Sequence, residues 1–120
     1  MQRIVSRVHR GLARLFLAGM LLEVYLAGTA LFGAGSFASH RMVGSALAIL
    51  AILLPALALA GRLGRYLIGL SLLLTLLTLI QVVLPSLRDT VSWVAALHPV
   101  NALALLGIGA VIGRHGQAAP

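Results

Sequence analysis

The chain has 120 residues, of which 61% are hydrophobic and 9% are charged, and it contains no cysteine. A soluble domain carries roughly 45–50% apolar and about 25% charged residues, so this composition excludes an ordinary soluble protein. The length holds four membrane spans of about 20 residues each, which leaves no room for a catalytic domain outside the membrane. The net charge of +7 comes from nine arginines and two acidic residues. In so apolar a chain this excess indicates membrane topology rather than nucleic-acid binding.

Four apolar runs follow one another, at about residues 12–33, 40–60, 66–85 and 91–113, and the pair His98 and Pro99 is predicted to interrupt the last of them. Each is long enough to cross roughly 30 Å of hydrocarbon as a helix with a rise of about 1.5 Å per residue. None shows the alternation of polar and apolar residues that is typical of barrel strands. The sequence therefore predicts a single all-α domain over residues 1–120, an integral membrane up-and-down four-helix bundle.

The connections between the runs are short. Residues 33–36 and 61–65 are rich in glycine, which is typical of turns. Ser36 or Ser39 is available to cap the second helix. Neighbouring helices must therefore be antiparallel.

The arginines are distributed unevenly along the chain. Seven precede the first span, lie in the second connection or follow the last span: Arg3, Arg7, Arg10, Arg14, Arg62, Arg65 and Arg114. Only Arg41 and Arg88 fall on the other side, so the positive-inside rule predicts that both termini are cytoplasmic. A cleaved secretory signal is the alternative, but the first apolar run is too long for one and contains Glu23, which favours an uncleaved anchor.

Two histidines near the membrane-spanning runs need an explanation, because ionisable side chains inside a bilayer are costly and usually mark a site. His40 begins the second helix and His98 lies near the start of the fourth, so both fall at the outer level of the membrane. In an up-and-down bundle these helices are diagonal partners that face each other across the core. Bis-histidine haem requires two imidazoles that approach iron from opposite faces at about 2 Å. The pair therefore predicts a haem b site with His40 and His98 as the metal ligands.

Four further residues are predicted to contact this cofactor. Gly44 and Asn101 follow the two histidines at helical intervals, where small residues leave room for a macrocycle, although small residues also serve close helix packing. Arg41 can pair with haem propionates or reach lipid headgroups. Gln81 ends a polar stripe on the third helix and is the member of that stripe nearest to the histidine level, although plain interhelical hydrogen bonding also explains such a stripe.

Three other ionisable residues have less specific explanations. Glu23 lies near the middle of the first span, where desolvation favours the neutral acid. It could carry protons, bond to a bound group or simply bond to a neighbouring helix. His9 and His115 flank the first and last spans, and we expect them to be solvated rather than to form a second metal site.

Three segments carry a resemblance: EVYLAG (residues 23–28), ASHRMVG (residues 38–44) and LHPVNA (residues 97–102). With them the chain resembles a family of small uncharacterised bacterial four-helix membrane proteins, over about residues 15–114. More distantly it is similar to one four-helix half of the haem A synthase type. That resemblance implies that His40 and His98 are axial haem ligands. The synthase has a glutamate shortly before its second-helix histidine, where this chain has GSF (residues 35–37), so the oxidative activity is not implied.

Two functions from different classes follow from these observations. The first is a b-type haem-binding protein of the bacterial inner (plasma) membrane, active in electron transfer, haem handling or redox sensing, and not an enzyme on its own. The second is a structural or accessory subunit whose polar residues only hold helices together. A transporter is a weaker third choice, because four short helices with one buried carboxylate make a poor pathway. Besides the lipid bilayer, the expected partners are a membrane redox protein or a second copy of the chain.

Overall fold

The computed structural model describes residues 1–115, and these residues are all-α. In chain order the elements are α1 (Gln2–Leu31), α2 (Phe37–Ala60), α3 (Arg65–Val83), the 3-10 helix η1 (Leu84–Leu87), α4 (Ser92–Ala95) and α5 (Leu97–Arg114). Among the described residues, four helical segments are long and apolar enough to span a membrane, with α3 continued by η1 and α5 preceded by α4. The prediction of an all-α four-helix membrane bundle is confirmed.

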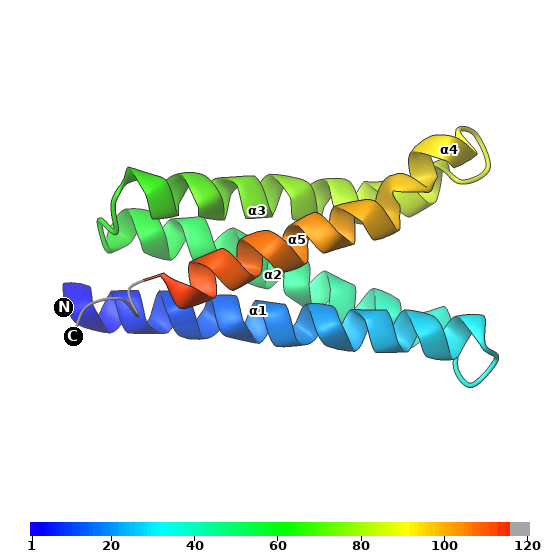
Figure 1. Ribbon diagram of the computed structural model, residues 1–120, viewed down its shortest axis with the longest axis horizontal. Helices are drawn as coiled ribbons and strands as arrows, with labels where there is room; N and C mark the ends of the chain where they lie inside the picture. The colour runs from blue at the N-terminus through cyan, green and yellow to red at the C-terminus, as the bar shows by residue number, and fades with distance from the viewer. Residues whose placement is uncertain (116–120) are drawn as a thin grey trace.

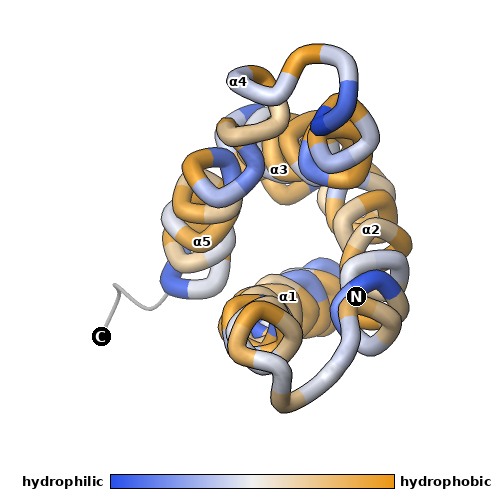
Figure 2. The backbone as a smooth tube through the Cα atoms, turned by 90° about the vertical axis from the view of Figure 1, so that its right-hand side faces the viewer, coloured by the Kyte–Doolittle hydropathy of each residue, from blue (hydrophilic) through white to orange (hydrophobic). Residues whose placement is uncertain are grey.

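The helices run up and down, and each packs against two neighbours in the ring α1, α2, α3, α5 (Figures 1 and 2). This order makes α2 and α5 a diagonal pair, as the sequence predicts. The start of α1, the α2–α3 turn and the end of α5 lie at one end of the bundle, on the left in Figure 1, and we call it the terminal end. The α1–α2 turn and α4 lie at the other end, which we call the loop end.

Local chemistry explains the turns. Gly33 and Gly64 have φ values of 73° and 89°, in the left-handed region where a glycine has no Cβ to clash. The Ser36 hydroxyl accepts a hydrogen bond of 3.3 Å from the backbone N–H of Ala38 and so caps α2. Each turn therefore reverses the chain within a few residues and holds adjacent helices antiparallel.

The core is apolar, and so is much of the outer surface. Large buried side chains from all four long helices meet along the axis of the bundle: Phe16, Leu54, Leu74, Leu105 and Ile112. The hydroxyl of Thr75 adds an interhelical hydrogen bond of 2.6 Å to the carbonyl of Ala51. Many leucines, isoleucines and valines point outward, as expected where the surrounding medium is lipid.

Two helix boundaries differ from the sequence-based expectation. α1 begins at Gln2, well before the predicted span at about residue 12, because the arginine-rich start continues the helix. The last apolar run is interrupted at Ala96, whereas the sequence predicts the interruption at His98 and Pro99. Pro99 instead lies in the first turn of α5, where a missing backbone N–H costs no helical hydrogen bond.

Candidate functional site

One group of polar side chains lies within the bundle toward one of its ends. At the loop end, side chains from all four long helices form a group that we call the histidine cluster: Glu23, His40, Gln81, His98 and Asn101. All five are predicted site residues, and the fold brings them together.

His40 is held by α1. Its Nδ1 lies 2.6 Å from Oε2 of Glu23, and the two side chains are 20% and 10% exposed. Gly44 follows His40 by one helical turn on the same face, and a Cβ built there would lie 3.5 Å from Oε2 of Glu23. The carboxyl group therefore fills the space between α1 and the start of α2, and it fixes the orientation of the imidazole through Nδ1.

His98 is held by α3 in a similar way. Its Nδ1 lies 3.0 Å from the backbone carbonyl oxygen of Gln81, and its Nε2 lies 3.3 Å from the side-chain Nε2 of Gln81. Both contacts are satisfied when Nδ1 carries the proton and Nε2 accepts from the amide. The amide of Asn101 donates to Oε1 of Gln81 at 2.7 Å and to the carbonyl of Leu77 at 2.9 Å, which fixes Gln81 in turn.

The two imidazoles meet across the diagonal of the bundle. Their ring centroids are 6.2 Å apart and their planes are inclined by 68°. The ring of Phe37 packs edge-on against His40, with centroids 6.0 Å apart. Side chains of two helices that are not neighbours in the ring thus approach each other at one level.

Arg41 lies outside this set of contacts. It is exposed, and its backbone carbonyl accepts a hydrogen bond of 2.9 Å from the hydroxyl of Ser45. A role for its guanidinium at the site therefore stays a prediction.

The contact between Glu23 and His40 is not predicted from the sequence, where Glu23 stands apart from the two histidines. Both residues lie in the helical hairpin around the turn at residues 33–36, which sets α1 against α2 in reverse order. Hairpin symmetry is the signal that could have placed Glu23 between one and two helical turns from the level of His40.

The expectation that His9 is solvated is wrong. His9 is fully buried, and its Nε2 lies 3.0 Å from the hydroxyl oxygen of Ser71. Because α1 begins at Gln2, His9 continues the inward stripe of Ala13 and Phe16 at helical spacing. His115 is exposed and stacks on Tyr66, with ring centroids 5.4 Å apart. Within residues 1–115 no three histidine, cysteine or acidic side chains form a group that could hold a metal ion.

One comparison identifies the family. A model of a protein family described as "Family of unknown function (DUF6220)" matches residues 23–88, which is more than half of the chain. The chain belongs to the DUF6220 family. The DUF6220 match begins at Glu23 and includes His40 and Gln81, whereas His98 and Asn101 lie beyond it. A comparison with curated proteins and one with solved structures each gave no match. The resemblance to the haem A synthase type stays a prediction.

Proposed function

We propose that this four-helix membrane protein binds haem b in the histidine cluster, with His40 and His98 as axial ligands. The observation that carries the proposal is the way in which both imidazoles are held. Each has its Nδ1 fixed by an oxygen of a neighbouring helix, a side-chain carboxyl oxygen for His40 and a backbone carbonyl for His98. Metal-ligating histidines almost always have the second ring nitrogen fixed in this manner, because it sets the tautomer and aims Nε2 at the metal.

The separation of the rings is compatible with this ligation. Two imidazoles bound to one metal from opposite sides at about 2 Å per bond have ring centroids roughly 6 Å apart. The observed distance is 6.2 Å. Nε2 of His40 makes no hydrogen bond within residues 1–115, so its lone pair is available when Nδ1 carries the proton. Nε2 of His98 would exchange its 3.3 Å contact with the Gln81 amide for the metal.

The donor set favours haem over a bare metal ion. Structural metal sites in proteins use about four side-chain ligands, and catalytic ones about three. The described residues hold no such group. A porphyrin brings its own four nitrogens and needs only two axial ligands, which is the number of histidines in the cluster.

The remaining cluster residues would position these ligands. Glu23 and Gln81 orient the imidazoles, Asn101 holds Gln81, and Gly44 makes room for the Glu23 carboxyl group beside His40. Arg41 lies at the edge of the site, where its guanidinium would pair with a propionate. When bound, haem supplies one-electron chemistry, which suits electron transfer or redox sensing, as well as haem handling. A site near one end of the bundle requires a redox partner, or a second copy of the chain, to pass electrons further.

The visible spectrum of the full chain, expressed with ample haem and purified in detergent, tests the proposal. We expect sharp α and Soret bands of low-spin haem on reduction. His40→Ala and His98→Ala should each remove these bands or convert them to a high-spin form, because one axial ligand is lost. The exposed His115→Ala is the matched control and should leave the spectrum unchanged. Protein without visible absorbance, or unaltered spectra in both cluster variants, would overturn the proposal.

A structural or accessory subunit is the second candidate. The observation that favours it is the contact of Gln81 with both nitrogens of His98, which ties α3 to α5 without any ligand. On this alternative, the same two alanine variants lower the thermal stability of a colourless protein, since each leaves a hydrogen-bonding group without its partner.

A further inference from the structure

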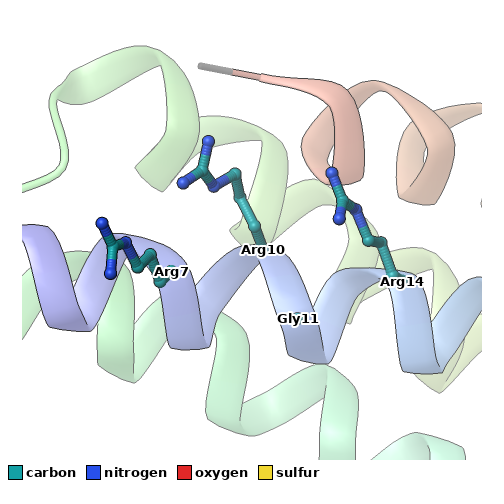
Figure 3. A pocket seen from close by; sticks show the side chains of 4 residues that line it. All are labelled: Arg7, Arg10, Gly11 and Arg14. Carbon is teal, nitrogen blue, oxygen red and sulfur yellow. The ribbon is translucent and has the colours of Figure 1, made fainter. Parts of the chain in front are cut away.

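The arginines of the first turns of α1 form a single stripe. Arg3, Arg7, Arg10 and Arg14 are spaced by four, three and four residues, which places them within about 60° of one another around the helix. In Figure 3 the side chains of Arg7, Arg10 and Arg14 leave α1 on the same side. Like charges at such spacings repel one another, so the stripe destabilises the bundle unless an opposite charge lies nearby.

A groove lies beside this stripe at the terminal end. It has a volume of about 870 Å³, and its lining includes Arg3, Arg7 and Arg10 of α1 and Arg62 of the α2–α3 turn. The side chain of Gln2 donates a hydrogen bond of 3.3 Å to the carbonyl of Arg62, which holds the turn against α1. We call this hollow the arginine groove.

A smaller hollow shares Arg7 and Arg10 with the groove and extends along α1 to Arg14. It has a volume of about 340 Å³ and is lined by Arg7, Arg10, Gly11 and Arg14 (Figure 3). Nε of Arg14 donates to the carbonyl of Gly113 at 3.0 Å, so the last turn of α5 is fixed to the same surface. The positively charged surface is thus built by three parts of the fold and not by one free tail.

No side-chain carboxylate is available to balance this charge. The chain has two acidic residues, Glu23 and Asp89. Glu23 lies against His40 near the loop end, and Asp89 pairs with Arg88 at 3.3 Å. No side-chain carboxylate therefore lies beside Arg3, Arg7 or Arg62 of the arginine groove, and an anion bound from outside the protein would balance these three charges.

The groove has apolar side chains as well as polar ones near it. Leu63 and Leu67 contribute to its lining, and the side chain of Ile4, next to Arg3 in α1, is 66% exposed. A small hydrated anion gains nothing from such neighbours, whereas a lipid buries its glycerol and acyl groups against them. Guanidinium groups bind phosphate oxygens in bidentate geometry.

We propose that the arginine groove binds the headgroup phosphate of an anionic phospholipid. The first test uses the full chain in detergent and compares phosphatidylglycerol, phosphatidylcholine and inorganic phosphate at equal concentrations. Phosphatidylglycerol should bind, as seen by native mass spectrometry, and should raise the melting temperature more than phosphatidylcholine does. No preference between the two lipids would overturn the proposal. An equal rise with inorganic phosphate would also overturn it, because the ligand would then be a soluble anion.

Matched variants separate the groove from general surface charge. Arg3→Gln/Arg7→Gln and Arg65→Gln/Arg114→Gln each remove two exposed positive charges from the terminal end, but only the first pair lines the groove. The affinity for phosphatidylglycerol should fall roughly tenfold or more in the first variant and less than about twofold in the second. Equal losses would overturn the proposal. If the first variant does not fold, Arg3→Lys/Arg7→Lys keeps the charge and should retain most of the binding, and its failure to bind any lipid would count against the groove.

Discussion

At the scale of single residues, the polar atoms buried in the bundle are matched with few exceptions. Within residues 1–115, only Nδ1 of His9 and Oε1 of Glu23 are buried side-chain atoms without a hydrogen-bond partner. A lone buried polar atom costs free energy because its hydrogen bonds to water are lost without replacement. Oε1 of Glu23 belongs to the carboxyl group that fixes His40, so this cost is incurred within the candidate site.

Glu23→Gln should preserve the folded protein. The side-chain carbonyl of glutamine can accept from Nδ1 of His40 as the carboxyl oxygen does, and its volume is nearly the same. Glu23→Leu removes the acceptor and should cost about 1–3 kcal/mol of stability. Thermal unfolding in detergent, followed by circular dichroism, measures both changes. A severe loss of folded protein in Glu23→Gln would mean that a negative charge is needed at this position.

The residues of the candidate site were more predictable than their contacts. His40 and His98 stand out because ionisable groups are rare in apolar runs, and the diagonal order of helices follows from the short turns. The pairing of Glu23 with His40 depends on the register of two packed helices, which side-chain shapes determine over many contacts. The burial of His9 depends on where α1 begins, and a run of arginines conceals that boundary from a hydropathy pattern.

At the scale of elements, the space left by small residues governs how the helices pack. In α1 a Cβ built on Gly19 would lie 2.5 Å from Cδ2 of Leu47, a buried side chain of α2. On Gly28 of the same helix a Cβ would meet nothing within 4 Å. The α1–α2 contact therefore depends on the absence of a side chain at Gly19, as is common where helices meet in membranes.

Gly19→Ala should accordingly destabilise the bundle, by about 1–3 kcal/mol, because Leu47 must leave its rotamer or the helices must separate. Gly28→Ala is the matched control in the same helix, and we expect it to be neutral or slightly stabilising. Chemical or thermal unfolding of the two variants in one detergent compares them directly. Equal effects would show that the close contact at Gly19 does not limit the packing.

The elements themselves were largely predictable from the sequence. Runs of about 20 residues that are rich in leucine and alanine specify membrane helices by length and composition alone. The interruption at Ala96 could not be read in this way, because the proline that suggests a break is tolerated in the first turn of α5. The predicted break at His98 and Pro99 was therefore wrong by a few residues, because a new helix begins just before Pro99 and is not kinked by it.

At the scale of the whole molecule, the arginines lie mostly at one end. The start of α1, the α2–α3 turn and the end of α5 carry seven of the nine, and the structure brings these three segments to the terminal end. The positive-inside rule assigns such an end to the cytoplasm. The fold is consistent with that orientation, which the membrane determines together with the charges of the protein.

Reporter fusions at Pro120 and at Asp89 test the orientation. A reporter active in the cytoplasm should give a signal only at Pro120, and one active outside should give a signal only at Asp89, because an odd number of spans separates the two positions. Reporters on the same side would require a different number of membrane-spanning helices.

The length of α1 has a consequence for how the protein fits a bilayer. With 30 residues this helix extends over about 45 Å, against roughly 30 Å of hydrocarbon. Tilting alone would need an angle above about 40°, the upper end of the range seen for membrane helices. Its packing against α2 and α5 ties it to helices of 24 and 18 residues. The surplus turns of α1, which carry Arg3, Arg7 and Arg10, therefore protrude into the headgroup layer of the bilayer that these shorter helices cross.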